Sequence, residues 1–208
     1  MILNLLLIEK FKSSLKKDNN KIIKLLFIAR FIPSKGLLTV IKSLEILIIQ
    51  NYKVQLIAIG DGEEISKAIN FISSKKLNPF ITFTKFIPEE ETYRYYSTSD
   101  ILVFPTFHQE GFPMTVFRSV AAGLPIITTK IRAAADYLKE PDNCLWVEPR
   151  NPEMLSEKII YLIEHPELRE QMSKNNKELV KQFTADKIAE EFIEIYKYLI
   201  RTTVEETQ

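Results

Sequence analysis

The sequence predicts an α/β fold with a Rossmann-like, doubly wound parallel sheet of about six strands, followed by C-terminal helices. The first observation is a set of short apolar, β-branched runs at residues 22–29, 54–60, 80–86, 100–106, 124–129 and 143–149. Near-continuous apolar runs are typical of strands that are buried on both faces. The second observation is that amphipathic stretches separate these runs. Such alternation favours parallel strands joined by right-handed crossovers.

The amphipathic stretches have helical spacing, and the first places five apolar residues on one face: Leu37, Val40, Ile41, Leu44 and Ile48. After residue 150 the strands stop, and the pattern predicts three helices, divided at His165-Pro166 and at Phe183-Thr184. Asn151 is a predicted N-cap because Pro152 follows it at the first helical position. Thr184 is the predicted cap of the last helix.

Three regions follow from this pattern: an N-terminal extension or linker remnant at 1–21, a main domain at 22–184, and a C-terminal helix and tail at 185–208. The N-terminal apolar run is shorter than the roughly 20 residues that a membrane helix needs. It also lacks the basic start and the small-residue cleavage site of a signal peptide. We therefore expect a cytoplasmic protein without a transmembrane segment, in which the Lys16-Lys17 pair is a candidate for peripheral membrane contact.

Composition excludes several classes of site. A net charge of +1 argues against a dedicated nucleic-acid binder, which usually has a strong basic excess. A single cysteine, Cys144, excludes an intrachain disulfide and a multi-cysteine metal site. Two histidines, His108 and His165, are too few and too far apart for a histidine-based zinc motif. We expect no metal site.

Two cations follow the first predicted strand, in "FIARFIPSKG". Arg30 ends the strand and Lys35 stands at the entrance to the next helix, an arrangement suited to binding a diphosphate. The alternative is a pair of ordinary surface cations in a loop. The next strand leads into "AIGDGEE", where Gly60 begins a Gly-x-Gly turn that also fits a simple strand-to-helix connection.

A carboxylate precedes a helix in "EGFPMT". The first N–H groups of a helix are free to bind an anion, and Glu110 could accept hydrogen bonds from sugar hydroxyls. The alternative is that Glu110 only caps the helix.

Taken in order, five segments resemble the C-terminal, donor-binding domain of GT-B fold retaining glycosyltransferases of family 4 (glycosyl transferases group 1). They are "ARFIPSKG", "IAIGDGEE", "ITFTKFIPEEETYRYYSTSDILVFPTFHQEGFP", "AAGLPIITT" and "NCLWVEPRNPEMLSEKI". The resemblance covers roughly residues 22 to 200 and implies that the sheet is one half of a GT-B fold.

The resemblance also implies roles for individual residues. Arg30 and Lys35 match the cations that bind the donor diphosphate and stabilise the leaving group, and Glu110 matches the glutamate that engages the donor sugar. These three are the predicted catalytic residues. The donor contacts that it implies are Arg30, Lys35, Gly60, Phe86, Ile87, Gly111, Phe112, Pro113, Met114, Thr115 and Arg118.

Arg118 departs from the family pattern, which has a second, ribose-binding glutamate at this position. A guanidinium has no acceptor, so Arg118 could only donate to ribose oxygens or to phosphate. A second departure is that the chain starts about where the second domain of such an enzyme should begin. Because the final helix normally packs on the first domain, we expect its apolar residues to lack cover: Ile188, Phe192, Ile195, Tyr196 and Leu199.

The resulting hypothesis is a hexosyl-type glycosyltransferase donor domain. It would transfer a sugar, with retention, from a UDP- or GDP-sugar to a saccharide or lipid-linked acceptor for polysaccharide, lipopolysaccharide or glycolipid synthesis, without a further cofactor. Two alternatives stay open: a truncated or non-catalytic sugar-nucleotide-binding module, and one subunit of a split enzyme whose acceptor domain is a separate protein. A nicotinamide oxidoreductase is disfavoured because no Gly-x-Gly-x-x-Gly follows the first strand.

Overall fold

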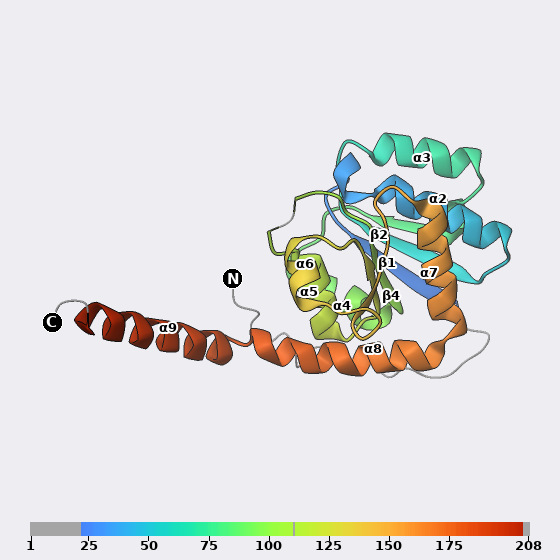
Figure 1. Cartoon of the computed structure of the whole chain (residues 1–208). Coiled ribbons are helices and arrows are strands. Elements are labelled where there is room, and N and C mark those ends of the chain that lie inside the picture. Colours follow the sequence, from blue (N-terminus) through green and yellow to red (C-terminus); the bar gives the residue numbers. More distant parts are fainter. Residues whose placement is uncertain (1–21, 110, 206–208) are drawn as a thin grey trace.

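Six parallel strands form one sheet, in the order β3-β2-β1-β4-β5-β6, in the computed structural model, which describes residues 22–109 and 111–205 (Figure 1). The strands are β1 Ile23–Ile28, β2 Val54–Ile59, β3 Ile81–Thr84, β4 Ile101–Phe104, β5 Ile126–Thr128 and β6 Cys144–Trp146. Each lies within one of the six predicted apolar runs. The predicted Rossmann-like fold class is therefore confirmed, with the strand order of the dinucleotide-binding folds.

Strand order reverses direction at the centre of the sheet, between β1 and β4. β1 pairs with β2 along its whole length, from Ile23 opposite Val54 to Ile28 opposite Ile59, and its other edge pairs with β4. The connection from β1 runs to one side of the sheet and the connection from β4 runs to the other. In open α/β sheets such a point leaves a crevice at the carboxyl ends of the strands, where ligands bind.

Helices lie on both faces of the sheet. They are α2 Leu37–Ile49, α3 Ile65–Ser74, α4 Glu89–Thr98, α5 Met114–Ala122, α6 Arg132–Tyr137, α7 Pro152–Glu164, α8 Pro166–Leu179 and α9 Ala185–Glu205, with short 3-10 turns at η1 Pro33–Lys35, η2 Asn78–Phe80 and η3 Val180–Phe183. α2 packs against α3 and α7, whereas α5 packs against α4 and α8 (Figure 1). Because both faces are covered, the central strands are almost fully buried, as Leu25, Leu26 and Phe27 illustrate.

The three predicted C-terminal helices are present, and the two predicted N-cap residues stand at the starts of α7 and α9. The Asn151 side chain accepts a hydrogen bond from the Met154 N–H at 2.8 Å at the start of α7. The Thr184 hydroxyl accepts from the Lys187 N–H at 3.4 Å at the start of α9. These local signals are therefore sufficient to place the helix starts.

The last helix, α9, projects from the body of the domain after η3 (Figure 1). Of the five apolar residues that the sequence predicted to lack cover, Phe192, Ile195, Tyr196 and Leu199 are more than half exposed. The fifth, Ile188, is only partly exposed. Within the described part of the chain, no helix is both long and apolar enough to cross a membrane.

Candidate functional site

A cavity of about 430 Å³ opens at the carboxyl edge of the sheet, beside the ends of β1 and β2. It also takes in the segment between β3 and α4, the first turns of α4, and one residue of α5. Its lining consists of Ile28, Ala29, Arg30, Ile59, Gly60, Asp61, Phe86, Ile87, Glu89, Thr92 and Arg118. This is the edge at which the topology predicts a ligand.

Two glycines allow the loops after β1 and β2 to meet at this edge. At Gly60, with φ at 140°, a Cβ atom would lie 1.9 Å from the Ala29 carbonyl oxygen. At Gly62 a Cβ atom would lie 2.5 Å from the Phe31 carbonyl oxygen. Because neither residue has a side chain, the Phe31 N–H can reach the Asp61 carbonyl at 2.8 Å. The two loops therefore form one continuous rim that carries Arg30.

The two predicted diphosphate-binding cations lie close enough for their charges to interact. Arg30 is exposed in the cavity lining, while Lys35 is half-buried with its Nζ atom 5.9 Å from the centre of the Phe104 ring. Burial and, to a smaller extent, the nearby Arg30 charge lower the pKa of Lys35 from its usual value. A bound anion would relieve the repulsion between these two cations.

The loop that carries Lys35 is fastened to the loop that follows β4. The Phe107 and His108 N–H groups both donate to the Ser34 carbonyl, at 2.8 and 3.1 Å. The Ser34 hydroxyl and the His108 Nδ1 atom are 3.2 Å apart. Lys35 is thereby held beside the segment that leads into α5.

That segment contains the predicted sugar- and phosphate-facing residues, and Glu110 lies outside the described residues. The Phe112 ring stacks on Phe117 with centroids 3.9 Å apart, and the Thr115 hydroxyl donates to the Ile28 carbonyl at 3.2 Å. Pro113 is buried and Met114 packs partly against the core. Gly111 is exposed, with open space where a Cβ would lie. Gly111, Phe112, Pro113, Met114 and Thr115 are not part of the cavity lining.

The segment that leads into α5 presents main-chain N–H groups, rather than side chains, to a ligand. No side chain among the described residues caps the first turn of α5. The leading N–H groups of a helix have no partner within the helix and attract anions. The start of α5 is therefore suited to phosphate through its main chain.

Arg118 does not stand alone in the cavity. Its Nη2 atom lies 2.5 Å from the Oε1 atom of Glu89, the first residue of α4. The Tyr93 hydroxyl lies 3.5 Å from the same oxygen. The guanidinium therefore has a carboxylate partner, which the sequence pattern did not reveal. Glu89 begins a run of three glutamates after Pro88, and such a run ordinarily indicates favourable helix-end chemistry.

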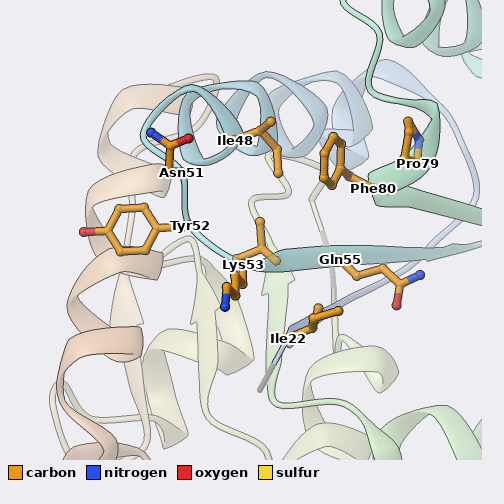
Figure 2. Close-up of a pocket in the computed structure, with 9 residues that line it drawn as sticks. Ile22, Ile48, Asn51, Tyr52, Lys53, Gln55, Pro79 and Phe80 are labelled. Atoms are coloured by element: carbon orange, nitrogen blue, oxygen red, sulfur yellow. The ribbon is translucent and has the colours of Figure 1, made fainter. Parts of the chain in front are cut away.

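A second hollow, of about 480 Å³, lies at the opposite edge of the sheet, near the amino ends of β1, β2 and β3 (Figure 2). Its lining is mostly apolar and includes Ile22, Ile48 and Phe80. The Tyr52 hydroxyl, at its border, donates to Glu164 at 2.7 Å. Ligands of open α/β sheets bind at the carboxyl edge, so we place the functional site in the first cavity.

The structure thus brings five of the predicted residues into one cavity: Arg30, Gly60, Phe86, Ile87 and Arg118. Lys35 is not part of the lining, although it is close enough to Arg30 for the two charges to interact. The polar side chains of the lining that the sequence pattern did not single out are those of Asp61, Glu89 and Thr92.

Comparison with known sequences decides the family. The model of the family described as glycosyl transferases group 1 matches residues 8–179. The chain belongs to this family. The capsular polysaccharide biosynthesis glycosyltransferase CapM of Staphylococcus aureus is 28% identical over 93% of the chain and 52% of CapM. The chain spans about half the length of the curated relatives it matches.

Solved structures agree on the fold. The C-terminal domain of the group 1 glycosyltransferase LpcC from Francisella tularensis superposes with a TM-score of 0.72 at 22% identity, over 84% of this chain and 96% of that domain. HepE of Anabaena, solved with UDP and glucose, gives a TM-score of 0.75 at 19% identity, over 89% of this chain and 54% of HepE. The domain is thus a Rossmann-like unit of the kind found in GT-B glycosyltransferases.

Proposed function

We propose that the chain is the donor-binding domain of a retaining, family 4 glycosyltransferase. It binds a nucleoside diphosphate sugar and supplies that sugar to a saccharide or lipid-linked acceptor. In the transfer, the bond between the anomeric carbon and the phosphate oxygen breaks and a glycosidic bond to the acceptor oxygen forms. The acceptor hydroxyl loses its proton, and the nucleoside diphosphate leaves with the extra negative charge.

The observation that carries this proposal is Arg30 in the lining of the cavity, with Lys35 close enough for the two positive charges to interact. Among the described residues, the N-cap position of α5 makes no side-chain hydrogen bond to the start of that helix. Negative charge on the diphosphate grows as the sugar bond breaks. Fixed cations and helix N–H groups next to that charge stabilise the transition state more than the ground state. No metal ion is needed for this form of leaving-group stabilisation.

The remaining lining fits a nucleoside. Phe86 is 81% exposed and, together with Ile87, offers an apolar surface to a base. Gly60 lets the main chain approach the ligand closely. Glu110, in the segment before α5, is assigned to the hydroxyls of the donor sugar on the basis of the family pattern.

Relatives support the substrate class. HepE, with the same fold, was solved with UDP and glucose, and CapM is named for capsular polysaccharide biosynthesis. We therefore propose a UDP- or GDP-sugar donor, a hexosyl-type transfer and a polysaccharide or glycolipid product.

The uncovered face of α9 favours a second candidate, in which the chain acts as one subunit of a split enzyme. Phe192, Ile195 and Tyr196 expose apolar surface that an acceptor domain would cover. The other alternative, a module that binds nucleotide sugar without turnover, is favoured by Arg118 in place of the motif glutamate. Co-purification with an acceptor-domain protein would support the split enzyme. Binding of the donor without sugar transfer, even when that acceptor-domain protein is present, would support the binding module.

The proposal is tested by isothermal titration calorimetry with UDP and GDP. We expect Arg30→Ala and Lys35→Ala each to weaken binding by about 2 kcal/mol or more, which is roughly 30-fold, because each removes a charge-assisted contact to phosphate. Lys181→Ala is the matched control, since it removes one positive charge from an exposed position on η3. Wild-type affinity in both variants would overturn the diphosphate assignment.

A further inference from the structure

We propose that Glu89, held in place by Arg118, is the carboxylate that binds the ribose hydroxyls of the donor nucleotide. This inference rests on the proposed function and adds a specificity-determining residue to the same site. The acceptor expected on α5 would then be supplied by the adjacent helix α4, and Arg118 would be its positioning residue.

The contacts of Glu89 leave one of its two oxygens available. Both Arg118 and Tyr93 approach Oε1, at 2.5 and 3.5 Å. Among the described residues, Oε2 has no hydrogen-bond partner in the structure, and the side chain is 49% exposed within the cavity lining. A carboxylate oxygen has two lone pairs, so Oε2 can accept from the 2′- and 3′-hydroxyls of ribose. Carboxylates read ribose hydroxyls in the same way in dinucleotide-binding folds.

Arg118 is built into the wall of the site rather than free to reach a phosphate. Its side chain is only 19% exposed, and its Nε atom is buried without a hydrogen-bond partner among the described residues. The side chain of Tyr96 is fully buried, and its hydroxyl group lies within hydrogen-bonding reach of Arg118 and Thr115. A guanidinium anchored in this way fixes the carboxylate of Glu89, since side-chain freedom that is already lost need not be lost on binding.

Charge also favours the pair. An unpaired carboxylate in the cavity would repel a diphosphate, whereas the Arg118–Glu89 pair is neutral overall and keeps its acceptor oxygen. Arg30 remains as the exposed cation of the lining and is assigned to phosphate. The cavity thus offers a hydrogen-bond acceptor for ribose at Glu89 and a cation for phosphate at Arg30.

Asp61 is the other carboxylate in the lining and the competing candidate. Its Oδ1 atom accepts from the Gly62 N–H at 2.7 Å, as in a turn that uses its own backbone. Unlike Glu89, Asp61 has no cation bonded to it among the described residues. We therefore favour Glu89, and the test includes both residues.

The test measures discrimination between ribose and deoxyribose. Calorimetric titrations of the full 208-residue chain would compare UDP with 2′-deoxy-UDP and GDP with 2′-deoxy-GDP. We expect the wild-type protein to bind the preferred ribonucleotide about tenfold more tightly than its deoxy form, which corresponds to about 1.4 kcal/mol. In Glu89→Ala this ratio should fall to about one while the 2′-deoxynucleotide affinity is kept or increased.

The matched control is Glu90→Ala, which removes the same charge from the next residue of α4, outside the cavity lining. It should keep the wild-type ratio. Arg118→Ala should lower the ratio as well, because Glu89 is then no longer held. A loss of stability in that variant does not mimic this effect, since a ratio between two ligands of one folded protein does not depend on the folded fraction.

The outcomes separate this inference from the proposed function. A wild-type ratio of one, a normal ratio in Glu89→Ala, or a ratio lost in Asp61→Ala instead would each overturn the ribose role of Glu89 while leaving diphosphate binding intact. No binding of any nucleoside diphosphate, or binding that Arg30→Ala leaves unchanged, would overturn the proposed function and this inference with it.

Discussion

Replacing Gly60 by alanine tests how closely the site depends on the approach of two loops. The added Cβ atom would lie 1.9 Å from the Ala29 carbonyl oxygen and 3.1 Å from the Phe31 ring. The first distance is far below any contact that a real Cβ makes, and the obstacle is main chain rather than a flexible side chain. The ends of β1 and β2 must therefore separate in this variant.

The expected cost has three parts. A φ of 140° is strained for an L-residue by about 1–3 kcal/mol. Moving the strand ends apart weakens the Ala29 N–H bond to the Ile59 carbonyl, now 3.1 Å, and the Gly60 N–H bond to Thr84, also 3.1 Å, each a net contribution of about 1 kcal/mol. We expect a loss of about 4 kcal/mol of unfolding free energy, or roughly 8–16 °C in melting temperature for a chain of this length.

Thermal and urea unfolding, followed by circular dichroism, measure this loss. Gly111→Ala is the control, because a Cβ there meets nothing within 4 Å, and it should melt within about 2 °C of the wild type. Nucleoside diphosphate titration of both variants adds a second readout, since a displaced β1 end also displaces Arg30.

A Gly60→Ala protein that melts with the wild type and binds nucleotide normally would show that the two loops do not depend on this close contact. A Gly111→Ala protein as unstable as Gly60→Ala would show that the close contact is not the cause of the loss.

Two further predictions concern a buried amide and a half-buried lysine. Asn176, fully buried on α8, donates to the Leu124 and Asn143 carbonyls at 2.7 and 3.1 Å, so Asn176→Leu should lower the urea unfolding free energy by about 3 kcal/mol. A destabilisation below about 1 kcal/mol would show that these carbonyls find other partners. Burial and the Arg30 charge lower the pKa of Lys35, so Lys35 should lose its charge at a lower pH than an ordinary lysine, whose value is 10.5. As the pH is raised, nucleotide affinity should therefore begin to fall before the pH reaches 10.5. Lys35→Arg should flatten this pH dependence, because guanidinium stays protonated, and an unchanged profile would contradict the role of Lys35.

The sign of the Lys35 effect on stability is opposite to its effect on binding. A lowered pKa means that the unfolded chain binds more protons than the folded chain between the folded pKa and 10.5. The ligand-free protein should therefore gain stability from this group as the pH rises through that interval.

Local patterns account for most of what could be predicted about the fold. Strands such as β1 are recognisable because a parallel strand covered on both faces needs apolar side chains in both directions. The start of α7 is recognisable because Asn151 and Pro152 satisfy a helix end with their own chemistry. The carboxyl edge of the sheet was marked by Gly60, whose backbone geometry excludes other residues.

The partner of Arg118 could not be predicted in this way. Glu89 belongs to a glutamate run whose local explanation, a favourable helix start, is sufficient by itself. The ion pair between Glu89 and Arg118 exists only because α4 packs against α5, which brings two residues from different helices into one cavity.

The sheet, the order of its helices and the edge that carries the cations could thus be predicted from local sequence, because each depends on the periodicity or backbone demands of neighbouring residues. Which charges meet at that edge could be seen only in the folded chain. Arg118 pairs with the Glu89 carboxylate, Lys35 lies within electrostatic reach of Arg30, and the Thr115 hydroxyl donates to the Ile28 carbonyl. The physical reason is that such contacts depend on how separate elements pack against one another, and helix packing is set by the whole core rather than by the residues that form the contact.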